Sequence, residues 1–336
     1  IPYMDVDIED EDSLSSRLET GKGKAPAAVD LAVIRFPRIS NFTDFNVFSG
    51  IPGVSLRYVT RACDLGIPDM VILPGTKNTI HDLLWMRQNG LEAAILKLAD
   101  RQVPVWGICG GYQMMGEVLV DEKGVESDLP SRTSGMGLLP LKTEFEKEKI
   151  RTQVEGAFGQ LDGCLGGLSG KSIEGYEIHM GRTYIDREEG AADTARIVSW
   201  RREPEICRPM DYVMETGKDR ILSRKARMDG WNRGNIYGTY VHGIFDSPGI
   251  ARTVAEALAA AKGLCLEQAA DMDYRTYRQQ QYDKLAEELR ENLDMAAVYR
   301  IMGISQKGKM GISQKGKGEE KPDDGYTVGT GTAGRH

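Results

Sequence analysis

A cysteine between glycines is the residue of this chain whose chemistry is easiest to recognise. Residues 106–113 read Trp-Gly-Ile-Cys-Gly-Gly-Tyr-Gln, which has the form G-x-C-x-G around Cys109. The segment follows an apolar run and precedes a predicted helix, as in a nucleophile elbow. Such a turn needs small neighbours, which Gly107 and Gly111 provide. The amides and positive dipole end of the next helix would favour a thiolate. The alternative, a buried cysteine that packs as a small hydrophobic residue, fits the other cysteines better.

His242 is the candidate base for this nucleophile. It ends the apolar segment 237–242, Tyr-Gly-Thr-Tyr-Val-His, and a glycine follows it. A nucleophile and its base are normally adjacent in space and not in sequence, so the long separation from Cys109 is no obstacle. The alternative is a strand-end histidine with a structural role, and the segment alone does not decide between the two. The turn at Cys109 favours the catalytic interpretation.

A loop at residues 73–79 offers donors for the negative oxygen that forms when a nucleophile attacks a carbonyl group. It reads Leu-Pro-Gly-Thr-Lys-Asn-Thr, follows a buried strand and begins the next predicted helix. The amides of Gly75 and Thr76 are the candidate oxyanion donors. Taken alone, the loop would be interpreted as an ordinary strand-to-helix connection.

The elements that position these residues alternate between apolar strands and helices. We predict buried strands over 29–36, 55–59, 69–73 and 103–109, an amphipathic helix over 91–98, and a helix over 110–119. This alternation predicts an α/β fold, a mostly parallel sheet flanked by helices. Further along the chain, we predict strands over 137–145, 173–184, 195–200 and 235–245, a helix over 250–261 and a helical segment over 271–302.

Composition limits the class of protein. The 336 residues are 40% hydrophobic and 28% charged, which is ordinary globular composition and allows a sizeable core. The net charge of -7 argues against nucleic acid as the main partner, and no apolar run is long enough for a membrane span. Five cysteines without a C-x-x-C pair and only four histidines argue against a disulfide framework and a metal site. A reducing cytoplasm is therefore the expected location.

The order of these features resembles class I, triad-type glutamine amidotransferases. The turn at Cys109, the loop 74–79 and the strand that ends at His242 carry this resemblance. Within the class, the segment 37–45, Pro-Arg-Ile-Ser-Asn-Phe-Thr-Asp-Phe, resembles one that is characteristic of the cobyric acid synthase family. The segment 175–181 is similar to a later motif of the same family.

The resemblance implies a flavodoxin-like amidotransferase fold with a C-terminal helical extension. It also implies that Cys109 attacks the side-chain amide of glutamine to form a thioester, while His242 transfers protons. The ammonia would pass to an N-terminal ATP-dependent synthetase domain that amidates carboxylates of a corrin in cobalamin biosynthesis. The expected oxyanion or glutamine-binding residues are Gly75, Thr76, Gly110, Tyr112 and Gln113.

The resemblance also predicts how the chain is divided. The expected parts are 1–26, a remnant of the preceding synthetase domain with a linker; 27–263, the amidotransferase domain; 264–302, the helical extension; and 303–336, a disordered tail. The first part is acidic, and the last contains a tandem repeat of eight residues with few large apolar side chains.

Two features depart from the family pattern. Many class I enzymes have a glutamate two residues after the histidine, where this chain has Ile244. Glu177 is the candidate orienting acid, and the alternatives are that it fixes its loop or binds the partner domain. The family's ATP site requires a glycine-rich phosphate loop, and the nearest match, at 165–172, has Leu165 in place of its first glycine. No cofactor is therefore expected in this chain, and ATP and magnesium are expected for the synthetase domain.

Other functions stay open at this stage. The chain resembles amidotransferase domains that serve other acceptors, such as cobyrinic acid or a cell-wall lipid precursor. It could also be a cysteine hydrolase of other amides, or a catalytically silent module that docks a synthetase partner. The presence of both Cys109 and His242 counts against the silent module.

Overall fold

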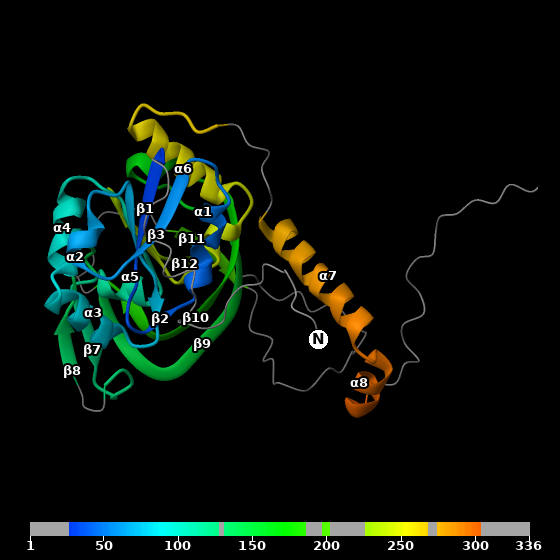
Figure 1. Ribbon diagram of the computed structural model, residues 1–336. Helices are drawn as coiled ribbons and strands as arrows, with labels where there is room; N and C mark the ends of the chain where they lie inside the picture. The colour runs from blue at the N-terminus through cyan, green and yellow to red at the C-terminus, as the bar shows by residue number, and fades with distance from the viewer. Residues whose placement is uncertain (1–26, 128–130, 186–196, 202–225, 268–273, 304–336) are drawn as a thin grey trace, which may run out of the picture. The chain divides into compact units, whose positions relative to one another are not determined.

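The computed structural model describes residues 27–127, 131–185, 197–201, 226–267 and 274–303 (Figure 1). The chain divides into two compact units, residues 6–283 and a second unit made of residues 1–5 and 284–336. All three sheets of the described residues and all the candidate catalytic residues belong to the first unit.

A six-stranded sheet forms the centre of the first unit, in the order β13-β14-β6-β4-β1-β3. Its strands are β1 (Val29–Ile34), β3 (Val54–Val59), β4 (Met70–Leu73), β6 (Val105–Ile108), β13 (Trp231–Arg233) and β14 (Ile236–Thr239). All neighbours run parallel except β13, which pairs antiparallel with β14 at one edge. Strands β4, β6 and β14 are buried along their whole length, as continuous apolar runs in a parallel sheet require. The predicted α/β class is confirmed.

Helices cover both faces of this sheet. In Figure 1, α2 (Ala62–Leu65), α3 (Thr79–Gln88) and α4 (Leu91–Asp100) lie on one side of β1 and β3, and α1 (Asn46–Ser49) and α6 (Ile250–Ala261) on the other. The predicted amphipathic helix is α4, whose Leu91, Ile95 and Leu98 are buried.

The helix after Cys109 is shorter than predicted. Helix α5 (Gly110–Met114) ends five residues before the expected boundary at 119, and strand β7 (Val118–Asp121) begins in its place. Gly116 permits this turn, because a Cβ there would lie 2.6 Å from the carbonyl oxygen of Leu141.

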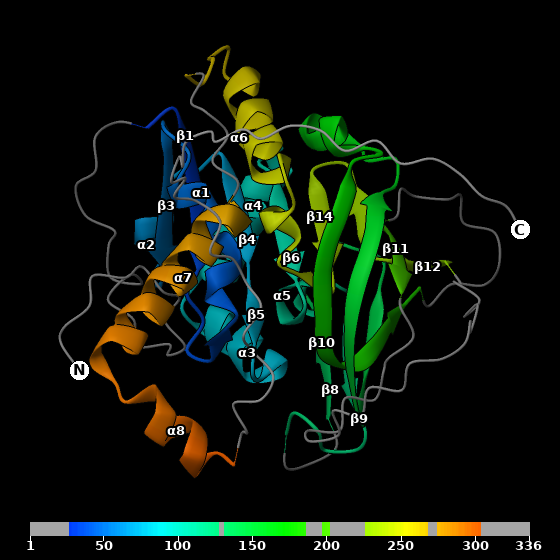
Figure 2. The same cartoon turned by 90° about the vertical axis from the view of Figure 1, so that its right-hand side faces the viewer.

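The second sheet contains β12 (Ala226–Asp229), β11 (Ile197–Arg201), β9 (Lys142–Phe158), β10 (Ser172–Tyr184) and β15 (Val241–His242) in that order, with β7 and β8 (Ser131–Ser134) beside β9. Strand β9 begins at Lys142, later than the predicted 137, and it ends at Phe158, well beyond the predicted 145. The run of four charged residues after Phe145 hides its continuation in the sequence. Figure 2 shows this sheet beside β6 and α5. Strand β10 pairs with β15, and Tyr176 lies directly opposite His242 in this pairing.

The near match to a phosphate loop is not one. Residues 163–168 form a short 3₁₀ helix, η3 (Gly163–Leu168), and Ser172 begins strand β10. A phosphate loop lies between a strand and the start of a helix, which is the reverse of this arrangement.

The predicted C-terminal helical segment is present as α7 (Tyr274–Asn292) and α8 (Met295–Ile301). The predicted linker, residues 1–26, and all but the first residue of the predicted tail, 303–336, lie outside the described residues. Within the described part of the chain, no helix is both long and apolar enough to cross a membrane.

Candidate active site

Cys109 lies at the strained turn between β6 and α5. Its backbone has φ 52° and ψ −108°, in a region that residues other than glycine rarely adopt. The residue is 8% exposed, and its thiol donates to the carbonyl oxygen of Ile178 on β10 at 3.5 Å. A backbone held in this conformation presents the sulfur at the carboxyl edge of the parallel sheet, as the G-x-C-x-G pattern predicts.

The glycines around Cys109 are required by space. A Cβ on Gly107 would lie 2.3 Å from Sδ of Met115 and 2.8 Å from the amide nitrogen of Tyr112. A Cβ on Gly111 would lie 2.0 Å from the carbonyl oxygen of Leu73. The prediction that both positions must be small is therefore confirmed.

His242 is held by a carboxylate from a segment that is distant in sequence. It is 1% exposed, and its Nδ1 lies 2.6 Å from Oδ2 of Asp44. Asp44 lies in the short 3₁₀ helix η2 (Phe42–Phe45), and its Oδ1 also accepts a hydrogen bond from the amide of Gly243 at 3.2 Å. Because both carboxylate oxygens are engaged at this strand end, the imidazole ring is anchored at its Nδ1 edge.

The surroundings of His242 favour its charged form. Burial lowers the pKa of His242, but the charge and the hydrogen bond of Asp44, together with the sulfur of Cys109, raise it to about 10. The cysteine and the histidine are therefore neighbours. An imidazolium beside a cysteine sulfur stabilises a thiolate nucleophile and can later give its proton to a leaving group.

The sequence-based candidate for the orienting acid, Glu177, is not the group that holds His242. It is fully buried, and its Oε2 lies 3.7 Å from Nε2 of His179. Successive side chains of a strand point to opposite faces, and on β10 it is Tyr176 whose ring stacks on His242. Glu177 therefore points away from the catalytic face, and Asp44 takes the expected place.

The sequence does not point directly to Asp44, because it lies 198 residues from the histidine. The signal that could have found it is the segment 37–45, which resembles a family-characteristic motif and contains one carboxylate. That segment forms strand β2 (Ile39–Ser40) and η2, and β2 pairs with β5 (Gly75–Thr76). The pairing brings the acid and the oxyanion loop to the same edge of the sheet.

The structure brings Gly75, Thr76 and Gly110 to the catalytic pair. A Cβ on Gly75 would lie 3.0 Å from Cε1 of His242, so a larger residue there would crowd the imidazole. A Cβ on Gly110 would lie 2.6 Å from Cγ2 of Thr76 and 3.2 Å from its amide nitrogen. The first amides of a helix have no intrahelical acceptor, so the amide of Gly110 is a further donor at this place. Their role as oxyanion donors stays a prediction.

Both ends of the Gln113 side-chain amide are engaged inside the fold, and its role as a glutamine-binding residue stays a prediction. Its Oε1 accepts from the hydroxyl of Thr79 at 2.9 Å, and its Nε2 donates to the carbonyl of Met180 at 3.0 Å and to the hydroxyl of Tyr240 at 3.1 Å. These hydrogen bonds join helix α5 to α3, to strand β10 and to Tyr240.

Tyr112 is also a packing residue. Its ring meets that of Tyr240 edge to face at 5.3 Å, and a Cβ on Gly238 would lie 2.1 Å from its Cδ2. It is 4% exposed and packs against β14 and Tyr240, and its role as a glutamine-binding residue stays a prediction.

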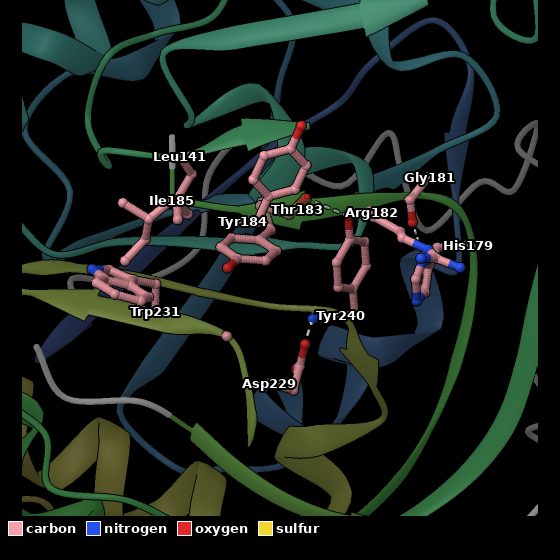
Figure 3. A pocket seen from close by; sticks show the side chains of 12 residues that line it. Leu141, His179, Gly181, Arg182, Thr183, Tyr184, Ile185, Asp229, Trp231 and Tyr240 are labelled. Carbon is pink, nitrogen blue, oxygen red and sulfur yellow. Dashed lines mark hydrogen bonds between the residues drawn. The ribbon is translucent and has the colours of Figure 1, made fainter. Parts of the chain in front are cut away.

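A cavity of about 480 Å³ lies beside this packing (Figure 3). Its lining residues are Tyr112, Leu141, His179, Gly181, Arg182, Thr183, Tyr184, Ile185, Asp229, Gly230, Trp231 and Tyr240, so neither Cys109 nor His242 lines it. The rings of His179 and Tyr240 stack at 3.7 Å, and the amide of Tyr240 donates to Asp229. Burial, reinforced by the charge of Glu177, raises the pKa of Asp229 to about 6. Among the described residues, no group of three or more histidines, cysteines or acids is arranged to hold a metal ion.

Comparison with known proteins shows which family of domains this chain is similar to. Residues 30–250 match the family of CobB/CobQ-like glutamine amidotransferase domains. A cobyric acid synthase from Ruminiclostridium cellulolyticum is 46% identical over 90% of this chain and 54% of its own length. Those from Lachnoclostridium phytofermentans and Photorhabdus laumondii subsp. laumondii are 43% and 40% identical, over 90% and 92% of this chain. The chain spans about half the length of these curated relatives.

Proposed function

Because the chain belongs to the family of CobB/CobQ-like glutamine amidotransferase domains, we propose that it hydrolyses the side-chain amide of glutamine and releases ammonia. The observation that carries the proposal is the arrangement of Cys109 on its strained turn beside the buried His242–Asp44 pair. This arrangement supplies the nucleophile, the proton carrier and the orienting acid that acyl transfer needs.

In the proposed mechanism, the sulfur of Cys109 attacks the side-chain carbonyl carbon of glutamine. The carbonyl oxygen becomes negative and is stabilised by amides in the region of Gly75, Thr76 and Gly110. The imidazolium of His242 gives its proton to the amide nitrogen, the carbon–nitrogen bond breaks, and ammonia leaves a thioester on Cys109. A water molecule then attacks the thioester and transfers a proton to His242, which frees glutamate and restores the thiolate–imidazolium pair.

The acceptor of the ammonia is proposed to be a corrin carboxylate, as in a cobyric acid synthase. The support is the identity of 46%, 43% and 40% to proteins of that name, over nine-tenths of this chain. A synthetase half that uses ATP and magnesium would activate the carboxylate, and the relatives are long enough to contain one. Cobyrinic acid and cell-wall precursors are the alternative acceptors, and the names of these relatives favour neither. The cytoplasmic location stays a prediction.

Labelling with a diazo-ketone analogue of glutamine tests the glutaminase proposal. We expect the reagent to alkylate Cys109, because the glutamine site delivers its electrophilic carbon to the thiolate. Peptide mass spectrometry should locate the label on Cys109, and glutamine should protect against it. Cys109→Ser should abolish the label, whereas Cys63→Ser, at an exposed cysteine, should leave it unchanged. An unlabelled Cys109, both in this chain alone and with the synthetase half of a relative added, would favour the silent docking module.

A further inference from the structure

One face of the His242 ring is covered by Tyr176. The two rings are nearly parallel, with centroids 5.3 Å apart and an interplanar angle of 19°. The residues are also directly opposite each other in the β10–β15 ladder. Tyr176 is 36% exposed while His242 is 1% exposed, so the tyrosine ring separates the imidazole from solvent on this side. An aromatic face against an imidazolium is also a favourable cation–π arrangement.

The hydroxyl of Tyr176 is held by the segment that carries the orienting acid. Nδ2 of Asn41 donates to this hydroxyl at 2.6 Å. Asn41 has φ 52° and ψ 36°, the left-handed conformation, and it begins the short helix η2. Its carbonyl accepts from the amide of Asp44 at 3.1 Å. These contacts form a closed cycle. Asn41 bonds to Asp44, Asp44 bonds to His242, His242 stacks on Tyr176, and Tyr176 bonds back to Asn41.

We propose that Asn41 and Tyr176 are positioning residues for His242 in the proposed glutaminase reaction, and we name the two residues the His242 clamp. The ring of Tyr176 fixes the plane of the imidazole, and Asn41 locks that ring to the turn that carries Asp44. Asp44 alone fixes the ring at one edge, through Nδ1. The clamp adds a contact to the ring face, which restrains rotation about the histidine side-chain bonds and keeps Nε2 directed at Cys109. The proposal rests on the proposed function of this site.

The rate of Cys109 labelling by the diazo-ketone tests the clamp. Tyr176→Leu should lower the limiting labelling rate about tenfold with little change in half-saturating reagent concentration, since a misdirected imidazole impairs proton transfer and not binding. The alkaline side of the pH profile of the labelling rate should move to lower pH, because the tyrosine ring no longer stabilises the imidazolium of His242. Asp44, Cys109 and Tyr176 are the titratable groups that act on His242 or stack on it, and the first two are unchanged in this variant.

Two milder variants separate the clamp from a general loss of folding. Tyr176→Phe keeps the stacked ring and loses the hydrogen bond, and Asn41→Gly keeps the left-handed backbone and loses the same hydrogen bond. Each should lower the rate about twofold to threefold, and the double variant should be no slower than either single one, since both remove one interaction. Tyr184→Leu is the matched control, since this tyrosine of β10 is 38% exposed and its ring lies near Lys142. It should label at the unsubstituted rate.

The clamp is overturned if Tyr176→Leu, with an unchanged melting temperature, labels at the rate and with the pH dependence of the unsubstituted chain. It is also overturned if the losses in Tyr176→Phe and Asn41→Gly simply add in the double variant. If the unsubstituted chain is not labelled at Cys109, either alone or with the synthetase half of a relative added, the proposed function fails and the clamp fails with it, so the two failures are distinguishable.

Discussion

Asp44→Asn is expected to lower the turnover rate of glutamine hydrolysis by about 10²- to 10⁴-fold, the range seen when the orienting acid of a catalytic triad loses its charge. Asp44 accepts two hydrogen bonds, from Nδ1–H of His242 and from the amide of Gly243. An asparagine has one acceptor oxygen, so its NH₂ group would oppose one of these two donors. The imidazole would then turn or adopt the wrong tautomer, and Nε2 would no longer serve Cys109.

The same substitution should change the pH dependence in a defined direction. With Asp44 present, the pKa of His242 is raised to about 10 in spite of burial, so the imidazolium persists through the neutral range. Without that charge, burial lowers the pKa. The alkaline limb of the rate should therefore move from near pH 10 to a much lower pH. The raised pKa stabilises the folded state fully below the ordinary value of 6.5, and this stabilisation is lost as pH rises through about 10. In Asp44→Asn, the free energy of unfolding should therefore no longer fall as pH rises toward about 10.

Steady-state kinetics and urea unfolding across pH 6 to 10 measure both effects. Glu177→Gln is the informative comparison, since it removes a buried carboxylate from strand β10 that the structure places beside His179. We expect Glu177→Gln to leave the alkaline limb in place. If the alkaline limb of the pH–rate profile moved in Glu177→Gln and did not move in Asp44→Asn, Glu177 and not Asp44 would be the acid that orients His242.

Gly111→Ala is expected to destabilise the fold by about 3 kcal/mol or more, which would lower the melting temperature by about 10 °C for a domain of this size. The added Cβ would lie 2.0 Å from the carbonyl oxygen and 2.5 Å from the carbonyl carbon of Leu73. Both are backbone atoms of the central strand β4, which cannot move without disturbing the parallel sheet. Any relief of the clash must shift helix α5, and with it the turn that presents Cys109.

Thermal unfolding by circular dichroism, together with Cys109 labelling, checks this prediction. Gly167→Ala is the control, because a Cβ at this exposed glycine would meet its nearest atom, Cγ2 of Thr253, at an ordinary 3.8 Å. It should change the melting temperature little and leave labelling intact. If Gly111→Ala were as stable and as readily labelled as the control, the close packing of α5 on β4 would be disproved.

The local parts of the site were predictable because short-range geometry decides them. The turn at Cys109 needs small residues two positions on either side of the nucleophile, and this spacing is visible in any six-residue window. His242 was found in the same way, as a histidine at the end of an apolar strand. The parallel sheet followed from apolar runs that alternate with helices, since a strand buried on both faces has no polar side.

The sequence by itself therefore predicted the proposed nucleophile and base, and it determined the glycines around Cys109 and the α/β class. Only the tertiary structure decided which carboxylate serves His242, because Asp44 lies 198 residues away and reaches it through the pairing of β2 with β5. The register in which β10 pairs with β15 likewise decides that Tyr176, and not Glu177, lies on the same face as His242. Contacts between distant segments depend on which strands and loops pair and in which register, and a local pattern of residues does not specify that pairing.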